Sequence, residues 1–209
     1  MKKILQLILS LTLISAVCAA VLAIVNNATK ERIASLDKLK AEKAARDVMP
    51  GVAVVVACED PEAPGDESLK AFVGYADEAK TKVVAYAVPG ISTKGYGGDI
   101  RLMVGLTPER TVISYQKLAA GETPGLGAKL STPEFIARFK DQPAAGVAVT
   151  KDGGKIEALT SATITSRAVC DAINDAVKRL EPELGMLLLV QRRLLEDGRD
   201  LLVAFLLRL

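Results

Sequence analysis

An uncharged apolar segment near the N-terminus is the strongest constraint on how this chain can fold. The segment runs from Ile4 to Val25, a stretch of 22 residues whose polar side chains are those of Gln6, Ser10, Thr12 and Ser15. A helix of that length reaches about 30 Å, enough to cross the hydrocarbon core of a bilayer. Lys2 and Lys3 precede it, which favours a cytoplasmic N-terminus and an exported remainder. We therefore expect residues 1–27 to form a single-pass membrane anchor.

A cleaved signal peptide is the alternative interpretation of this segment. Ala16-Val17-Cys18 and Cys18-Ala19-Ala20 resemble small-residue cleavage sites. Cleavage would leave the apolar residues 21–25 at the new N-terminus, and the segment is longer than a typical signal core. A lipoprotein signal at Cys18 is disfavoured because Val17 stands where a small residue is expected. The uncleaved anchor is the preferred prediction.

Residues 28–50 are predicted to be a helical juxtamembrane spacer. The stretch is rich in Ala, Lys, Glu and Arg, and Ile33, Leu36 and Leu39 are spaced to share one helical face. Pro50-Gly51 ends the pattern, so the helix should stop before these two residues.

Composition excludes several classes of function. The chain has no His, which removes Ser-His-Asp and Cys-His catalysis and histidine-ligated zinc. Cys18, Cys58 and Cys170 are too few and too widely spaced for an iron–sulfur cluster or a Cys-only zinc site, although a Cys58–Cys170 disulfide stays open. The net charge of +2, without a basic patch, argues against nucleic-acid binding. No catalytic and no metal-binding residue is predicted.

Residues 51–184 are predicted to form one α+β domain. Five short segments, rich in β-branched residues and bounded by turn formers, are predicted strands; they are Val52–Ala57, Lys82–Val88, Ile100–Leu106, Thr111–Ser114 and Gly146–Thr150. An acidic loop, Glu59–Glu67, and a short helix, Thr132–Phe139, lie between them. Early strands, a late helix and no βαβ alternation favour the α+β class. The tail of residues 185–209 has two apolar pieces, neither able to span a bilayer, and is assigned no role.

A hydroxyl-rich loop, Thr160-Ser161-Ala162-Thr163, leads into a predicted helix near the end of the domain. Val169, Ile173, Val177 and Leu180 recur at helical spacing and define its apolar face. The start of such a helix offers free backbone N–H groups and the positive end of the helix dipole to a phosphate. A plain N-cap formed by Ser and Thr, without a ligand, is the alternative.

Two glycine-rich segments precede this loop. Gly95-Tyr96-Gly97-Gly98 predicts a tight turn between strands, or a backbone that lies close to a flat ring with Tyr96 as a stacking face. In Glu122-Thr123-Pro124-Gly125-Leu126-Gly127, Pro124-Gly125 suits the centre of a type II turn. The second glycine beside it, Gly127, indicates a close approach to the backbone, although a surface turn explains the segment as well.

These three segments resemble, in order and spacing, the FMN-binding domain family and within it the G subunit of the Rnf electron-transport complex. The family motif is an acidic residue, two spacers and Ser/Thr-Gly-Ala-Thr, matched here from Glu157 to Thr163. The resemblance implies that Thr163 carries FMN as a phosphoester installed by a flavin transferase. It also implies a flavin site close to three groups of residues: Thr160, Ser161 and Ala162; Glu122, Thr123, Gly125, Leu126 and Gly127; and Tyr96.

The chain departs from the family motif at two positions. Ser161 stands where the family has Gly, and Glu157 where it has Asp. If the Gly position requires a positive φ, a Ser there costs about 1 kcal/mol or more.

The resemblance implies an electron-transfer subunit, incomplete as an enzyme, on the exported, periplasmic side of a bacterial inner membrane. Its partners would be the other membrane subunits of an Rnf-type complex, a ferredoxin and NAD oxidoreductase. Two alternatives stay open. One is an anchored structural subunit without flavin, suggested by Ser161, and the other is the C subunit of a sodium-pumping NADH:quinone reductase.

Overall fold

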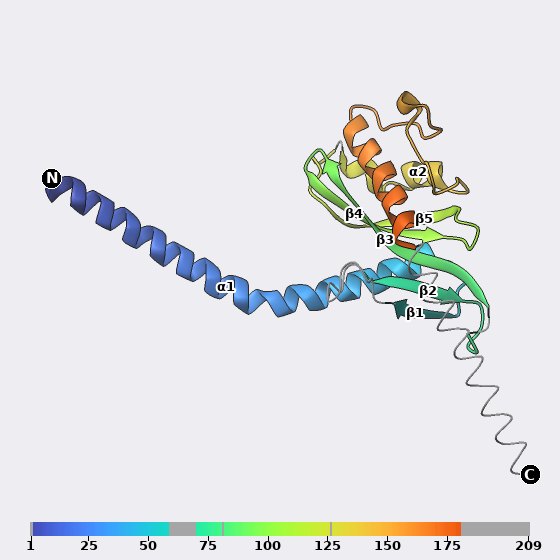
Figure 1. The fold of residues 1–209 in the computed structure, drawn as a ribbon, viewed down its shortest axis with the longest axis horizontal. Coiled ribbons are helices and arrows are strands. Elements are labelled where there is room, and N and C mark those ends of the chain that lie inside the picture. The colour runs from blue at the N-terminus through green and yellow to red at the C-terminus, as the bar shows by residue number, and fades with distance from the viewer. Residues whose placement is uncertain (1, 59–69, 81, 126, 181–209) are drawn as a thin grey trace, which may run out of the picture. The chain divides into compact units, whose positions relative to one another are not determined.

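The computed structural model describes residues 2–58, 70–80, 82–125 and 127–180, drawn in colour in Figure 1. The predicted acidic loop Glu59–Glu67, the site residue Leu126 and the tail 185–209 lie outside the described residues. The chain divides into two compact units with the boundary between Leu39 and Lys40.

The first unit is the N-terminal part of one long helix, α1 (Lys2–Val48). Within α1, Gln6–Lys30 is long and apolar enough to cross a membrane. Its apolar side chains are exposed to the surroundings, as a lipid-facing helix requires. Helical structure over the apolar segment agrees with the predicted anchor and equally with a signal sequence, since both are helical and apolar.

The C-terminal end of α1 belongs to the second unit and to its core. Ala41, Ala45 and Val48 are fully buried and cluster with side chains of the sheet. The helix ends at Val48, before Pro50-Gly51, as the sequence predicts.

In the part of the chain that the structure describes, the second unit is built on one antiparallel sheet whose five strands follow the chain in order. The strands are β1 (Val54–Cys58), β2 (Ala71–Tyr75), β3 (Val83–Gly95), β4 (Gly98–Leu106) and β5 (Val112–Ala120), arranged β1-β2-β3-β4-β5. Every pairing of these strands is antiparallel, and each strand lies beside its neighbour in sequence. Together with the helices, the sheet confirms the α+β class.

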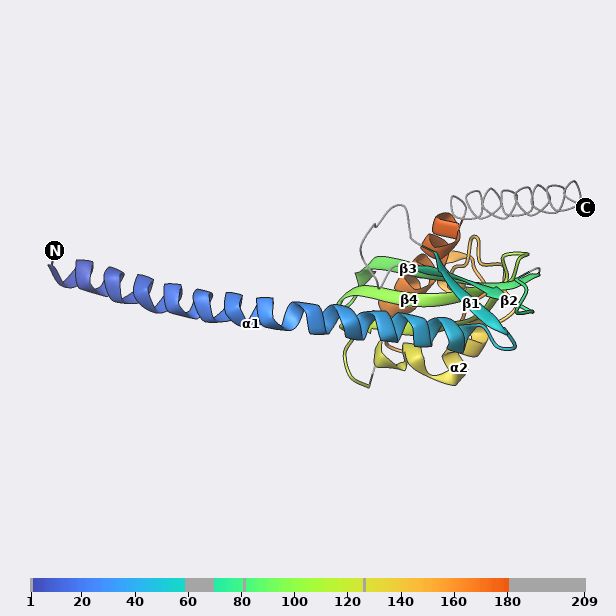
Figure 2. The same cartoon turned by 90° about the horizontal axis from the view of Figure 1, so that it is seen from below.

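Alternate side chains of the strands point into two separate hydrophobic clusters. On one face of β4, Ile100, Leu102 and Val104 pack into the cluster that includes the helix of residues 163–180. On the other face, Met103 packs into the cluster that includes the C-terminal end of α1. The helix of residues 163–180 and the end of α1 therefore cover opposite faces of the sheet (Figures 1 and 2).

The helix of residues 163–180 is fixed to β3 by specific polar contacts. Asp175 Oδ2 accepts a hydrogen bond from Ile91 N–H at 2.9 Å, and Lys94 Nζ lies 3.0 Å from Asp171 Oδ2. As predicted, Val169, Ile173, Val177 and Leu180 are buried, and their shared face packs toward the sheet.

Short helical elements follow β5 along the chain and pack against it. The predicted helix Thr132–Phe139 is present as α2 (Pro133–Ile136) followed by the 3-10 turn η3 (Ala137–Phe139). A further 3-10 turn, η2 (Gly127–Ser131), precedes them, and Tyr115 of β5 donates its hydroxyl hydrogen to the carbonyl of Leu130 in η2.

One predicted strand is wrong, and one strand of the sheet was missed. Gly146–Thr150 is not a strand: it makes one isolated bridge, Val149 to Ile156, and its end belongs to the 3-10 turn η4 (Thr150–Asp152). The reason is that the Asn174 side chain accepts from Gly146 N–H and donates to Val147 O, so these backbone groups bond a helix side chain. Conversely, β2 was not predicted, because all five of its residues are buried and the alternation typical of a half-buried strand is missing.

Candidate functional site

A cavity of about 490 Å³ brings together residues from all three segments singled out in the sequence. It lies where the β3–β4 hairpin tip, the loop after β5 and the start of helix 163–180 meet. Its lining residues are Tyr96, Glu122, Thr123, Gly127, Ser161, Ala162, Thr163, Ile164 and Thr165.

Thr163 is the first residue of its helix, and the residue before it cannot cap that helix. The carbonyl of Ala162 accepts the first helical hydrogen bond, from Ser166 N–H at 3.0 Å, so Ala162 occupies the N-cap position. An alanine has no side-chain oxygen with which to bind the free N–H groups of the first turn. The alternative of a Ser or Thr N-cap is therefore wrong, and the first turn can offer these donors to an anion.

The hydroxyl of Ser166 is fully committed to shaping the loop. Ser166 Oγ accepts from Leu159 N–H at 2.9 Å and donates to Ala162 O at 3.0 Å, and the side chain is buried. These two bonds hold residues 159–162 in a tight turn before the helix. The turn presents Thr163, which is half-buried, to the cavity.

Ser161 adopts a backbone conformation that favours glycine. Its φ is +62°, in the left-handed region, and the residue is exposed. Ser161 occupies the Gly position of the family motif, and this position has a positive φ in this chain, which is the condition under which the sequence predicts a strained serine. A non-glycine residue there costs about 1–2 kcal/mol.

Glu157, the second departure from the motif, lies outside the residues that line the cavity. Its carbonyl accepts a hydrogen bond from Arg138 Nη1 at 2.6 Å, and its carboxylate lies 3.9 Å from the same guanidinium. The acidic side chain at this position therefore contacts Arg138, which belongs to the 3-10 turn η3.

The loop after β5 forms the opposite wall of the cavity. Gly125 has a φ of +80°, as the third position of the predicted type II turn requires. At Gly127 a Cβ would lie 2.3 Å from Glu122 Oε2, so only glycine allows the loop to close on this carboxylate. Thr165 Oγ1 donates to the same oxygen at 2.7 Å, which joins the loop to the first turn of the helix.

Two exposed apolar side chains border the cavity. The strands β3 and β4 are joined by the predicted tight turn, with Tyr96 at its tip. Tyr96 is 70% exposed and Ile164 is 49% exposed; among the described residues from Lys40 onward, they are the large hydrophobic side chains left open. Apolar faces of this kind suit a flat aromatic ring.

The structure assembles most of the predicted site residues and adds two. Of the described candidates, Thr160 and Gly125 do not line the cavity, although both belong to segments that do. Ile164 and Thr165 were not predicted as site residues. Ile164 could have been predicted from the sequence, because it is an apolar residue that lies outside the apolar face of its helix.

The residues present fit a flavin mononucleotide. A volume of about 490 Å³ lies within the range of about 300–1,000 Å³ usual for small-molecule sites. The uncapped helix start suits the phosphate, Thr163 supplies a hydroxyl beside it, and Tyr96 and Ile164 supply apolar faces for the ring.

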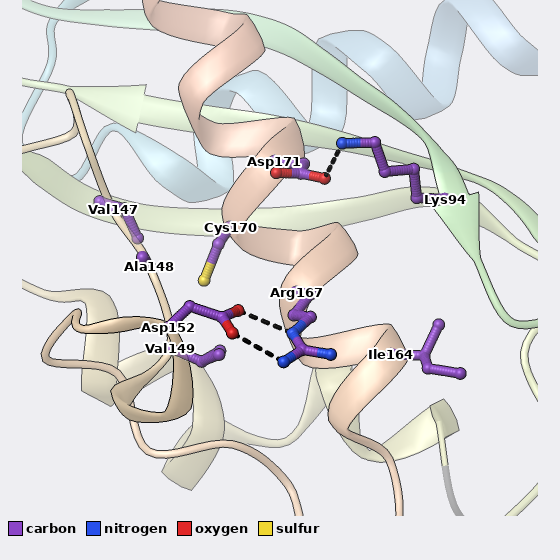
Figure 3. A pocket seen from close by; sticks show the side chains of 9 residues that line it. All are labelled: Lys94, Val147, Ala148, Val149, Asp152, Ile164, Arg167, Cys170 and Asp171. Atoms are coloured by element: carbon purple, nitrogen blue, oxygen red, sulfur yellow. Dashed lines mark hydrogen bonds and ion pairs between the residues drawn. The ribbon is translucent and has the colours of Figure 1, made fainter.

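A second cavity, of about 380 Å³, lies along the same helix and shares Ile164 with the first (Figure 3). Arg167 donates two hydrogen bonds of 2.7 Å to Asp152, and these bonds lower the pKa of that carboxyl and raise the pKa of the guanidinium. Lys94 faces Asp171 across the same cavity. Each of these two cations thus has a carboxylate partner, which leaves little attraction for an incoming anion.

Cys170 also faces this second cavity, as a buried thiol. Burial raises its pKa to about 12, with smaller contributions from the negative charges of Asp171 and Asp152. The thiol is therefore protonated at neutral pH and is a poor nucleophile. All three cysteines of the chain are thiols, so Cys58 and Cys170 are not joined as a disulfide in this structure.

Comparison with known proteins identifies the family. The FMN-binding domain family matches residues 95–178. The G subunit of the ion-translocating oxidoreductase complex of Methanosarcina acetivorans is 32% identical over 88% of this chain and 98% of its own length. The G subunit of the proton-translocating ferredoxin:NAD(+) oxidoreductase complex of Clostridium ljungdahlii is 44% identical over 53% of this chain and 61% of its own.

A solved structure shares the fold. The C subunit of the Na(+)-translocating NADH-quinone reductase from Parabacteroides distasonis covers 69% of this chain and 92% of its own, with a TM-score of 0.51 and 17% identity. The shared motifs, the domain match and the full-length relative lead to one conclusion: the chain belongs to the family of G subunits of ion-translocating oxidoreductase complexes and contains an FMN-binding domain.

Proposed function

We propose that this chain is the electron-transfer subunit of a membrane-bound ion-translocating oxidoreductase, with FMN held as a phosphoester on Thr163 Oγ1. The observation that carries the proposal is the convergence of three distant segments on one cavity at the uncapped start of a helix. A covalent link suits a carrier on the exported side of a membrane, where a dissociated flavin would be lost.

Each part of the site has a role in this proposal. The free N–H groups and the dipole of helix 163–180 bind the phosphate. Tyr96 and Ile164 cover the apolar ring, and the loop of Glu122 and Thr123 forms the wall opposite Thr163. The bound flavin supplies reversible electron transfer, while the protein fixes its position and surroundings.

Attachment requires a flavin transferase as a partner. Forming the bond between Thr163 Oγ1 and phosphorus releases the hydroxyl proton and the leaving group of the flavin nucleotide donor. The chain has no His to accept that proton, and Glu122, the carboxylate lining the cavity, already binds Thr165. We therefore assign the base to the transferase.

The proposed setting is a bacterial inner membrane. Residues 1–27 anchor the chain in a single pass, residues 28–50 connect the anchor, and the FMN-binding domain of residues 51–184 is periplasmic. The core of this domain also receives side chains from residues 41–48 of α1. The remaining partners are the other membrane subunits of the complex, consistent with the names of the relatives.

Mass spectrometry of the intact chain tests the proposal directly. When the chain is produced together with a flavin transferase, we expect the added mass of one FMN and flavin fluorescence that stays with the denatured band. Thr163→Ala should lose both and keep the circular dichroism of the fold, whereas Thr163→Ser should keep part of the label because it retains a hydroxyl. Covalent flavin in the Thr163→Ala protein would place the attachment elsewhere.

A flavin-free structural subunit is the second candidate, and the backbone strain at Ser161 favours it. The two candidates differ in one outcome. A transferase that labels a related protein in the same cells but leaves this chain colourless would support the structural role.

A further inference from the structure

Glu122 is held by protein groups from both other segments of the site. Its Oε2 accepts the hydroxyl hydrogen of Thr165 at 2.7 Å, and its Oε1 faces Gly97 N–H at 3.4 Å. The carboxylate therefore connects the loop after β5 to the start of helix 163–180 and, more weakly, to the hairpin tip. These contacts are with the protein itself, whereas the family resemblance suggests a direct contact between this side chain and the flavin.

The start of helix 163–180 needs such a contact. Ala162 provides no side-chain cap, and the ends of helices without caps fray. The hydrogen bond from Thr165 to Glu122 compensates, because it ties the first turn to the loop after β5. Thr165 is buried and Glu122 is half-buried, so their hydrogen bond is partly protected from competing water.

The absence of a side chain at Gly127 is what allows this arrangement. A Cβ there would lie 2.8 Å from Glu122 Cβ and 3.0 Å from Thr165 Oγ1, in addition to its collision with Oε2. The second glycine of the loop thus makes room for the Glu122–Thr165 pair, which explains its position without any contact to a ligand.

We propose that Glu122 is a positioning residue that acts through Thr165, on the understanding that Thr163 is the flavin acceptor proposed above. The hydrogen bond fixes the first helical turn and so directs the hydroxyl of Thr163, two residues earlier, into the cavity. Glu122 thereby controls how well the transferase can reach this hydroxyl.

The first test uses the full-length chain made without a transferase, so that no flavin is involved. Glu122→Ala and Thr165→Val should each lower the melting temperature by about 5 °C, since each breaks a partly buried hydrogen bond to a charged group. The double variant should melt close to either single variant, because both remove the same interaction. Glu122→Gln and Thr165→Ser keep an acceptor and a donor and should stay within about 2 °C of the unaltered chain.

The second test measures the rate of flavin attachment by mass spectrometry. Both disruptive single variants and the double variant should be slower by about tenfold, and the two conservative variants by less than about twofold. Once loaded, Glu122→Gln should have the flavin spectrum and the pH dependence of reduction of the unaltered protein, because the carboxylate acts through Thr165. Matched controls are Glu109→Ala and Thr93→Val, both at exposed positions, which should change neither measurement.

Two results would overturn the inference. One is additive losses of melting temperature in the double variant, which would mean that the two side chains act independently. The other is a changed flavin spectrum in Glu122→Gln with normal attachment in Thr165→Val, which would mean direct contact with the flavin. If the unaltered chain is never labelled, the proposed function fails, while the flavin-free melting temperatures still decide the role of Glu122.

Discussion

Replacing Ser161 with glycine should stabilise the protein. At a φ of +62°, the Cβ of Ser161 costs about 1–2 kcal/mol, and glycine removes that cost. Glycine also gives the unfolded chain more freedom, which offsets about 0.4–1 kcal/mol of the gain. The expected net increase in unfolding free energy is about 0.5–1 kcal/mol, or about 1–4 °C in melting temperature for a protein of this size.

Circular dichroism is the suitable assay, because the chain has no Trp for fluorescence. Thermal unfolding of the full-length protein in detergent should be compared for the unaltered chain, Ser161→Gly and Ser161→Ala. The alanine variant keeps the Cβ and therefore the strain, so it should not gain stability. A melting temperature raised equally by both substitutions would refute the argument, since the hydroxyl and not the backbone would then be responsible.

Three further predictions concern groups around the site. Tyr115→Phe should lower the unfolding free energy by about 1–3 kcal/mol in chemical denaturation, because it leaves the buried carbonyl of Leu130 without its donor. Cys170 should resist alkylation by iodoacetamide at pH 8 until the protein is unfolded, as measured by peptide mass spectrometry. Because burial raises the pKa of its thiol from 9.0 to about 12, the free energy of unfolding should fall as the pH rises from 9 to 12. Arg167→Met should raise the lowered pKa of Asp152 toward 3.8 in an NMR titration. In the unaltered protein, the ion pair should contribute to the free energy of unfolding above pH 3.8, and this contribution should be lost as the pH falls through the lowered pKa of Asp152.

Each of these predictions has a clear contradictory result. An unchanged denaturation midpoint for Tyr115→Phe would mean that the hydroxyl contributes nothing to holding η2. Stoichiometric alkylation of native Cys170 would mean that the thiol is open to solvent. An Asp152 pKa that does not respond to Arg167→Met would exclude the guanidinium as the cause of the shift.

Local patterns in the sequence predicted the elements that are stabilised locally. The apolar face of helix 163–180, the end of α1 before Pro50 and the tight turn at Tyr96 follow from spacing and from the conformational limits of Gly and Pro. The strand prediction failed at Gly146–Thr150, where Asn174, far along the chain, binds the backbone. No local pattern contains that contact.

The sequence singled out residues that the structure brings together in one cavity, but it could not indicate the contacts among them. Thr163, Glu122 and Tyr96 were selected through family resemblance, and all three line one cavity. The bond between Glu122 and Thr165 joins residues 43 positions apart, so spacing along the chain could not indicate it. The positive φ at Ser161 was stated only as a condition, because a sequence contains no dihedral angles until the loop is built.

The sheet with strands in chain order has a consequence for biogenesis. Neighbouring strands can pair as soon as each emerges, because every connection within the sheet is between consecutive strands. The proposed acceptor, the hydroxyl of Thr163, lies on helix 163–180, the last element that the structure describes. We expect it to reach its final environment only when that helix packs on the finished sheet. If Thr163 is the acceptor, flavin attachment should follow completed folding, and a transferase that recognises the assembled cavity would leave immature chains unlabelled.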